Sequence, residues 1–463
     1  MLSSMQSIES LYCDHIYQLQ SRYDRLLDEQ GYDGLLIHAG STQSYYLDDN
    51  HRPFKTNPHL LAWAPLTHHP ECCLLIRPGY APRLFYYNPT DFWYKPAGAP
   101  DGFWTKYFDI EIMDKPDQVS RGLEGNKNIA FFGERADLAE KWGLTDINPK
   151  PLLSALHWYR ACKTDYEVEC LRRANDIAAK GHLLAERTFR NGASEFEIQM
   201  AYLSATRQRE SELPYGNIVA LNENASVLHY QYYQCLKPDL CHSFLIDAGA
   251  AYNGYASDVT RTYCQDIEML GKDDSGARNL DLHESVFSAL IDALDSAQQR
   301  LIGSIKPGQS FIKLHQQMCL DIGAILQQHK LVNASAEAQL HQGILRAFFP
   351  HGLGHLLGLQ VHDVGGLQAD ANGTPALAPD DYPFLRLTRT LETGMVFTIE
   401  PGIYLIDSLL AELKAGSAAS AVNWSMVDSL RPFGGIRIED NIHLTASGCE
   451  NLTRNSLAAL GKV

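Results

Sequence analysis

Two aspartates in the stretch Ser243–Tyr263 are the residues of this chain best placed to do chemistry. An Asn-Gly pair at 253–254 lies between two β-prone runs and favours a two-residue hairpin turn, because both residues tolerate a positive φ. Counting outward from this turn places Asp258 opposite Gly249. Because side chains alternate along a strand, Asp247 shares their face, with the two aspartate Cβ atoms roughly 6–8 Å apart. Like charges this close repel, so the hairpin predicts one or two metal ions between them.

Three histidines, His351, His355 and His362, form a second group of metal-type ligands. Their spacing is compatible with a helical zinc site, but no glutamate follows the first histidine, and Gly352 and Gly354 disfavour a helix. The glycines instead predict a backbone that passes close to a neighbour, with a histidine directed at it. One histidine here is equally well explained as a hydrogen-bonded, half-buried imidazole, whereas three in so short a segment favour a functional role.

Two strand-like segments near the C-terminus contain further carboxylates. Met395–Tyr404 is an apolar strand in which a proline stops the hydrogen-bond ladder directly after Glu400. A carboxylate embedded in so apolar a run needs a partner, because an unpaired buried charge is costly. In the segment 435–444, alternation places Arg437 and Glu439 on one face. For those two residues alone, a surface ion pair is the simpler interpretation.

Taken together, these segments offer four carboxylates and an imidazole. This donor set suits a pair of divalent ions of intermediate hardness, such as Mn²⁺, with Co²⁺ and Zn²⁺ as alternatives. Two ions about 3.5–4 Å apart can hold a bridging water and lower its pKa toward about 7, which supplies hydroxide near neutral pH. Residue types and spacing therefore predict a dimetal hydrolase and leave its substrate open.

The elements that must position these residues divide the chain near residues 158–163. Alternating helix and strand patterns predict an N-terminal α/β domain over residues 1–160, and helices that bracket strands predict an α+β domain over residues 161–463. Capping boxes at Thr164–Glu167 and Ser194–Glu197 mark two helix starts. The expected helices are 8–30, 164–189, 194–209, 281–302 (with Asp281 as N-cap) and 310–328. The expected strands are 34–39, 72–77, 83–87, 128–132, 216–221, 226–230 and 395–400, and residues 370–386 are expected to be irregular.

Composition limits the class of protein. A chain of 463 residues exceeds one ordinary core and predicts two domains. The net charge of −16 argues against nucleic acid or an anionic membrane as the main partner. No signal-peptide pattern is visible at the N-terminus, and no apolar run reaches the length of about 18 residues that a transmembrane helix needs. Ten scattered cysteines without a C-x-x-C pattern predict reduced thiols and a cytoplasmic location.

The order of the motifs resembles that of a known family. The chain contains, in this order, Ile-Asp247-Ala-Gly, Ser-Asp258-Val-Thr-Arg-Thr, His351-Gly-Leu-Gly-His355, Ile-Glu400-Pro-Gly and Gly-Ile-Arg437-Ile-Glu439-Asp. These motifs are similar to those of the pita-bread metallopeptidases, and most of all the bacterial prolidases (Xaa-Pro dipeptidases), a group that includes organophosphorus acid anhydrolases. Segments 47–59, 215–225, 433–440 and 450–454 are also similar to this branch. The resemblance covers nearly the whole chain and implies an α+β protein with an N-terminal α/β domain and a C-terminal pita-bread (creatinase/aminopeptidase-like) domain.

The resemblance implies a role for individual residues. The implied metal ligands are Asp247, Asp258, His355, Glu400 and Glu439, with Asp258 and Glu439 bridging two ions. Glu400 is also the expected acceptor of the proton from the nucleophilic water. His229 and His362 are expected to face the scissile carbonyl, where they stabilise the oxyanion or protonate the leaving nitrogen. His351 and Arg437 are expected to line the prolyl side, with Arg437 binding the substrate's terminal carboxylate, and Tyr215 is an expected pocket residue.

The implied activity is hydrolysis of Xaa-Pro dipeptides by a metal-bridged hydroxide. The expected partner is therefore a small peptide, with no nucleic acid and no membrane, and the first domain and a neighbouring subunit of a homodimer are expected to exclude longer peptides. Phosphotriester hydrolysis is an expected side activity, because the same hydroxide can attack phosphorus. Three further functions stay open: an aminopeptidase that removes the residue before proline from longer peptides, a dedicated phosphotriesterase, and a non-catalytic pita-bread binding protein.

Overall fold

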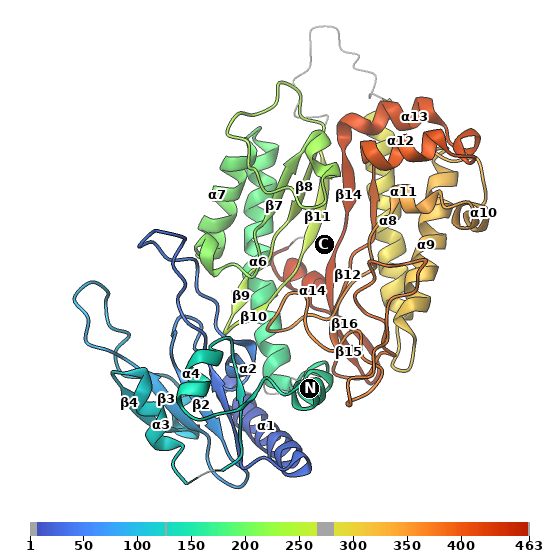
Figure 1. The fold of residues 1–463 in the computed structure, drawn as a ribbon. Coiled ribbons are helices and arrows are strands. Elements are labelled where there is room, and N and C mark those ends of the chain that lie inside the picture. The colour runs from blue at the N-terminus through green and yellow to red at the C-terminus, as the bar shows by residue number, and fades with distance from the viewer. Residues whose placement is uncertain (1–6, 126, 266–281, 462–463) are drawn as a thin grey trace, which may run out of the picture. The chain divides into compact units, whose positions relative to one another are not determined.

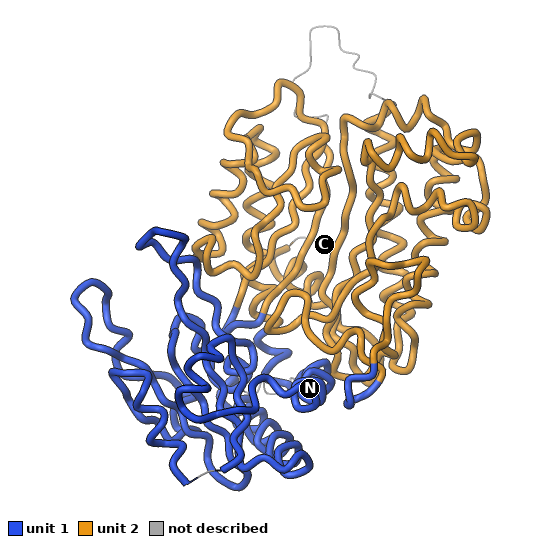
Figure 2. The backbone as a smooth tube through the Cα atoms, viewed as in Figure 1, with its two compact units in different colours: residues 1–170, 252–255, 370–374 blue, residues 171–251, 256–369, 375–463 orange. Residues whose placement is uncertain are grey.

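The computed structural model describes residues 7–125, 127–265 and 282–461, which form two compact units (Figure 2). Unit 1 comprises residues 1–170, 252–255 and 370–374, and unit 2 comprises residues 171–251, 256–369 and 375–463. We propose residue 160 as the domain boundary in sequence, because one helix ends at Arg160 and the next begins at Asp165.

Unit 1 is an α/β domain built on one sheet. Its strands are β1 (Gly34–His38), β2 (Cys73–Ile76), β3 (Arg83–Tyr87), β4 (Asp109–Met113), β5 (Ile129–Phe132) and β6 (Asp146–Ile147), and its helices are α1 (Ile8–Gln30), α2 (Pro58–Leu61), α3 (Val119–Gly122), α4 (Ala136–Lys141) and α5 (Lys150–Arg160). The six strands lie in the order β4-β3-β2-β1-β5-β6. β2 is antiparallel to both of its neighbours, and the other three pairs are parallel. The alternation predicted for this domain is confirmed.

Unit 2 combines long helices with short sheets, and α6 leads into it from unit 1. The helices are α6 (Asp165–Arg190), α7 (Glu195–Thr206), α8 (Leu282–Ser304), α9 (Phe311–Gln328), α10 (Ala336–His341), α11 (Leu345–Phe348), α12 (Asp407–Ala415), α13 (Trp424–Leu430) and α14 (Leu452–Ala459). The strands are β7 (Ile218–Leu221), β8 (Ser243–Asp247), β9 (Ala251–Tyr252), β10 (Tyr255–Ala256), β11 (Thr260–Cys264), β12 (Val396–Ile399), β13 (Gly402–Tyr404), β14 (Gly435–Arg437), β15 (Asp440–Thr445) and β16 (Gly448–Asn451). They form the sheets β11-β8-β7, β12-β15-β16, β13-β14 and β10-β9. Figure 1 shows α6 and α7 on one side of these strands and α8 and α9 on the other.

The helix starts predicted from capping boxes are confirmed. The backbone N–H of Thr164 donates to Glu167 Oε2 (2.9 Å), and Ser194 and Glu197 make the same reciprocal pair at the start of α7. Asp281, the expected N-cap of α8, lies outside the described residues. Residues 370–386 contain no helix and no strand beyond an isolated bridge at Pro375, as expected. Among the described residues, no helix has both the length and the apolarity needed to cross a membrane.

Two predictions for the segment between residues 194 and 230 are wrong. Helix α7 ends at Thr206 instead of near residue 209, because Arg207 adopts a left-handed conformation (φ 55°) that ends the helix. Residues 226–230 form no strand: Ser226 ends the 3₁₀ helix η4 (Asn222–Ser226), and residues 227–230 form the turn that follows it.

The buried carboxylate of Glu195 explains why no strand forms there. Its two oxygens accept hydrogen bonds of 2.8–2.9 Å from four groups between residues 221 and 234. These are Leu221 N, Asn224 Nδ2, Tyr230 Oη and Gln234 N. A buried charge satisfied by four donors holds the segment in a loop around itself. The alternation of residue types contains no information about this contact.

Candidate metal centre

The hairpin predicted around Asn253-Gly254 is present. Both turn residues have positive φ (51° and 87°) and connect β9 to β10. Further out, β8 and β11 pair antiparallel with Asp247 opposite Thr260, which is the predicted register. One hydroxyl contacts both aspartates, since Tyr215 Oη lies 2.7 Å from Asp247 Oδ1 and 2.6 Å from Asp258 Oδ1. The two carboxylates therefore share one face, as expected, and Tyr215 lies between them.

Arg437 compensates part of this charge. Its Nη2 donates to Asp247 Oδ2 at 2.7 Å, and its Nε donates to Thr260 Oγ1 at 3.2 Å. Arg437 and Glu439 are only 5% and 2% exposed, so the surface ion pair considered for these two residues is wrong. Arg437 and Glu439 are both buried, as their exposures show. The ion pair of Arg437 is with Asp247, at the end of strand β8.

His355 is directed at the carboxylates by the segment that carries it. This segment runs beside β12, where His355 N donates to Thr398 Oγ1 (3.1 Å) and Thr398 N donates to His355 O (2.9 Å). The Nδ1 of His355 lies 3.0 Å from Leu356 O, which can only accept, so Nδ1 is the donor and Nε2 is the nitrogen open to a ligand. Nε2 lies 3.3 Å from Asp258 Oδ2 and 3.7 Å from Glu400 Oε1.

Gly354 makes this close approach possible, as the sequence predicts for the glycines between the histidines. A Cβ atom at position 354 would lie 2.0 Å from the carbonyl oxygen of Thr398. That is far inside any van der Waals contact, so only glycine fits the observed backbone.

The remaining two carboxylates come from strand ends. Glu400 follows β12, and its backbone N–H donates to Leu353 O (2.8 Å). Glu439 lies between β14 and β15, where its N–H donates to Thr260 O (3.0 Å) and its Oε2 accepts from Thr260 Oγ1 (2.8 Å). Asp258, His355 and Glu439 each offer a ligand atom within 4.8 Å of the others, and all three are buried. The structure therefore brings three of the five predicted ligand residues within 4.8 Å of one another, and Asp247 and Glu400 border them through Tyr215 and His355.

Carboxylates outnumber the cationic groups here: Asp258 and Glu439 are buried, and Asp247 and Glu400 are half-buried. Burial, followed by the neighbouring carboxylates, raises the pKa of Glu439 well above its usual value. Burial raises the pKa of Glu400 to about 7 and also raises that of Asp247. Asp258 differs, because the hydrogen bond and charge of His355 outweigh burial and lower its pKa. A divalent cation would favour the ionised form of all four carboxylates, and oxygen ligands with one imidazole suit such ions. The residues present therefore fit the predicted ions.

Tyr404 is a member of the site that the sequence analysis missed. Arg437 Nη1 donates to Tyr404 Oη (2.9 Å), and His351 Nε2 lies 2.8 Å from the same hydroxyl. Because His351 Nδ1 must donate to Gly352 O, and because burial and Arg437 lower the pKa of His351 to about 3, its Nε2 accepts from Tyr404. The only sequence feature that indicates a role for Tyr404 is its position in the strand directly after Glu400. No motif spacing predicts that its hydroxyl contacts Arg437 and His351.

The two histidines expected at the scissile carbonyl lie in different settings. The ring of His362 is 4.3 Å from that of His355, in an edge-to-face arrangement, and burial followed by the charge of His355 lowers its pKa to about 4. His229 is exposed, in the turn after η4 instead of the expected strand. Burial is the largest cause of the lowered pKa of both His351 and His362, and electrostatic interaction with His229 is a smaller one, so His229 lies within electrostatic reach of both.

The fold and the site define a class. An α/β unit followed by an α+β unit with a buried cluster of carboxylates and histidine is the architecture of the pita-bread metallopeptidases, as predicted. The chain belongs to this class by sequence as well: residues 169–446 match metallopeptidase family M24, and residues 10–158 match the N-terminal domain of Xaa-Pro dipeptidases. The protein is thus a member of a family of metal-dependent peptide hydrolases.

Its relatives specify the branch. The chain is 47% identical to the Xaa-Pro dipeptidase of Shewanella woodyi over 452 residues, which cover 97% of this chain and 99% of the relative. It is also 47% identical to the Xaa-Pro dipeptidase of Aeromonas hydrophila over 455 residues, 98% of this chain and 100% of the relative. The predicted resemblance to bacterial prolidases is confirmed.

Solved structures share the fold at lower identity. Proline aminopeptidase P II from Yersinia pestis is similar with a TM-score of 0.69 and 24% identity over 96% of this chain and 99% of that chain. Pseudomonas aeruginosa aminopeptidase PepP is similar with a TM-score of 0.70 and 22% identity over 98% of each.

Proposed function

We propose that this protein is an Xaa-Pro dipeptidase that acts through two divalent ions. The observation that supports the proposal most is the buried cluster of Asp258, His355 and Glu439, whose ligand atoms lie within 4.8 Å of one another. Asp247 and Glu400 border this cluster through Tyr215 and His355. Full-length relatives named Xaa-Pro dipeptidase supply the substrate class.

Each residue of the site has a proposed task. Two divalent ions held by these residues, for which we propose Mn²⁺ with Co²⁺ or Zn²⁺ as alternatives, would lower the pKa of a bound water toward about 7 and would polarise the scissile carbonyl. Asp258 and Glu439 are the proposed bridging ligands, and Glu400 accepts the proton of the attacking water. His362 and His229 stabilise the oxyanion or protonate the leaving nitrogen.

Arg437 is the proposed anchor for the terminal carboxylate of the substrate. A guanidinium has five N–H donors, and Asp247, Tyr404 and Thr260 engage one each. Among the described residues, these bonds leave two donors for a carboxylate, on a side chain whose position the same bonds hold. A preorganised cation of this kind suits a dipeptide, whose carboxylate lies one residue beyond the cleaved bond.

Replacing Tyr404 by phenylalanine is expected to lower kcat/KM for Ala-Pro by about tenfold or more, because a hydrogen bond to a charged group contributes about 1.5–3 kcal/mol. The loss should appear mainly in KM, since Tyr404 holds the two residues proposed to line the prolyl side. Steady-state kinetics measure both parameters. Tyr12→Phe is the matched control: this tyrosine is also fully buried, and its hydroxyl donates to Trp63 O in the N-terminal unit. Equal kinetics in the two variants would contradict the assignment of Tyr404.

The dipeptide preference is tested by substrate length. Metal-stripped protein resupplied with Mn²⁺, Co²⁺ or Zn²⁺ is assayed on Gly-Pro, Ala-Pro and Leu-Pro and on an Xaa-Pro-Yaa tripeptide. The expected result is turnover of the dipeptides at least about tenfold above that of the tripeptide, because a longer chain moves the carboxylate away from Arg437. Equal turnover of the two lengths would instead support an aminopeptidase.

Assays of the same metal-loaded protein also distinguish a dipeptidase from a phosphotriesterase and from a binding protein. Hydrolysis of organophosphate triesters is a proposed side activity, and triester turnover above that on any peptide would identify a dedicated phosphotriesterase. Metal-loaded protein that cleaves neither substrate would support a non-catalytic binding protein.

The location and the oligomeric state are proposals as well. We propose a cytoplasmic location, because all ten cysteines lie among the described residues and none forms a disulfide. The homodimer implied by the resemblance is tested by light scattering of the full chain.

A further inference from the structure

We infer that Gln298, a buried side chain of α8, is a positioning residue that sets the separation of Glu400 and Glu439 and thereby the affinity of the site for divalent ions. The inference rests on the dimetal function proposed above. Gln298 contacts neither carboxylate, and nothing in its sequence context marks it.

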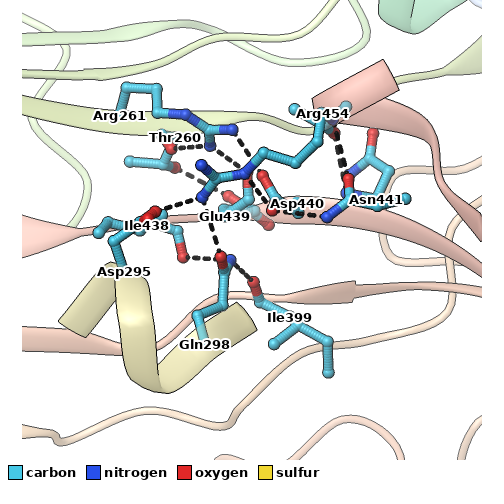
Figure 3. Close-up of polar contacts among 12 residues, drawn as sticks. Thr260, Arg261, Asp295, Gln298, Ile399, Ile438, Glu439, Asp440, Asn441 and Arg454 are labelled. Atoms are coloured by element: carbon cyan, nitrogen blue, oxygen red, sulfur yellow. Dashed lines mark hydrogen bonds and ion pairs between the residues drawn. The ribbon is translucent and has the colours of Figure 1, made fainter. Parts of the chain in front are cut away.

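The amide of Gln298 joins the two chain segments that carry these ligands. Its Nε2 donates to Ile399 O at 2.7 Å and to Ile438 O at 3.1 Å (Figure 3). These are the residues directly before Glu400 and Glu439, and Gln298 itself is 0% exposed. Both amide hydrogens therefore hold backbone atoms adjacent to the proposed ligands.

The strand pairing is interrupted at the two glutamates. The β12–β15 ladder ends at the pair Ile399–Asp440, and the β13–β14 ladder begins at the pair Gly402–Arg437. Glu400 and Glu439 lie in the break between these ladders, which one backbone bond, from Ile438 N to Pro401 O (3.2 Å), also spans. Their backbone N–H groups donate in different directions, to Leu353 O and to Thr260 O. Between the two ladders, the amide of Gln298 bonds both segments through side-chain hydrogen bonds, at Ile399 O and at Ile438 O.

The orientation of the amide is held by the residues around it. Its Oε1 accepts from Arg454 Nη2 (3.2 Å) and from Gln299 Nε2 (2.8 Å). A flipped amide would place its oxygen against two carbonyl oxygens and its NH₂ group against a cation, so only the observed orientation satisfies all partners. Arg454 is fixed in turn by Asp440, whose Oδ2 accepts from Nε at 2.8 Å, and by Asp295.

The same network reaches the other ligand segments. Arg261 Nη1 donates to Thr260 O and Glu439 O, both at 2.8 Å, and its Nη2 donates to Asp440 Oδ1 at 2.6 Å. Asn441 accepts from Asp258 N at 3.0 Å and donates to Asp258 O. Groups behind metal ligands typically change metal affinity by about 10–100-fold when they are removed. Arg261 and Asn441 connect the segments of Asp258 and Glu439, whereas Gln298 connects those of Glu400 and Glu439.

Gln339 is a matched control for the merely structural effect of losing such an amide. It is also 0% exposed, and its Nε2 donates to two backbone oxygens, Gly323 O (2.8 Å) and Ala334 O (2.9 Å). These groups belong to α9 and to the residues before α10, which contain no candidate ligand. Methionine has a volume similar to that of glutamine but no N–H donor, so it removes the two bonds to backbone oxygens at either position. Gln298→Glu also removes both N–H donors of Gln298, but it keeps an oxygen that can accept from Arg454.

The experiment is a calorimetric titration of Mn²⁺ into metal-stripped wild-type, Gln298→Met, Gln298→Glu and Gln339→Met proteins, with their metal-free melting temperatures. Both Gln298 variants are expected to bind Mn²⁺ at least about tenfold more weakly, and excess Mn²⁺ should restore part of kcat. Gln339→Met should bind like wild type although its metal-free protein melts at a lower temperature. If Gln298→Met and Gln339→Met bind Mn²⁺ with affinities within twofold of each other, the inference about Gln298 is wrong, whereas the proposed function still stands. A wild-type protein that binds no ions refutes the proposed function and, with it, this inference.

Discussion

Replacing Asp258 by asparagine is expected to lower turnover of Ala-Pro by about 10³-fold or more, because a bound ion supplies several kcal/mol of transition-state stabilisation. Asp258 lies at the centre of the cluster, with Oδ1 at 2.6 Å from Tyr215 Oη and Oδ2 at 3.3 Å from His355 Nε2. Asparagine keeps the shape and one acceptor oxygen but cannot bridge two cations. Kinetic assays should therefore be combined with elemental analysis of bound metal, which is expected to fall with activity.

The metal-free protein separates a ligand role from a structural one. Asp258 adds negative charge to a cluster in which it raises the pKa of both Glu400 and Glu439, behind burial as the largest cause. The pKa of Asp258 is nevertheless lowered, so its charge is net stabilising in the folded protein, and metal-free Asp258→Asn should melt at a slightly lower temperature than wild type. If Asp258 is a ligand, added Mn²⁺ should raise the melting temperature of wild type by more than that of the variant. Asp407→Asn is the control, since Asp407 also pairs with a basic side chain, that of Arg431, but is 75% exposed. Full turnover in Asp258→Asn would falsify the proposed centre.

Replacing Gly354 by alanine is expected to reduce kcat/KM by about 10²-fold, the loss that a misplacement of about 1 Å produces. The added Cβ would meet Thr398 O at 2.0 Å and Thr398 Oγ1 at 2.9 Å. Relief of this clash must move either β12 or the segment that carries His355. Either movement changes the distances among the ligands. Thermal unfolding should also show a loss of about 1–3 kcal/mol, typical of overpacking.

Gly303→Ala provides the comparison. Gly303 lies in α8, and a Cβ there has no atom within 4 Å. Alanine has the higher helix propensity, so this variant should be as stable as wild type or more stable by up to about 1 kcal/mol, with unchanged kinetics. If Gly354→Ala behaved like Gly303→Ala, close packing beside β12 would not position His355.

The local parts of the site could be predicted from the sequence. The register of the hairpin follows from the Asn-Gly turn and from alternation, and this placed Asp247 opposite Thr260 before any contact was known. The same holds for the position of Glu400 at the end of a buried strand and for the helix starts at Thr164 and Ser194. In each case the information lies within a few residues of the feature, and the backbone geometry is regular.

Which distant side chains meet was decided by the tertiary structure. Arg437 looked like the partner of Glu439 two residues away, yet its ion pair is with Asp247, on another sheet. Tyr404 and Gln298 had no local signal in the sequence, because their partners are far away along the chain. Arg437 lies 33 residues from Tyr404, and Ile399 and Ile438 lie at least 101 residues from Gln298. The loop that carries His229 was predicted as a strand, since its alternation does not show the buried Glu195 around which it folds. Alternation and turn chemistry fix backbone geometry over a few residues, whereas the partner of a buried charge depends on which segments the whole chain packs together.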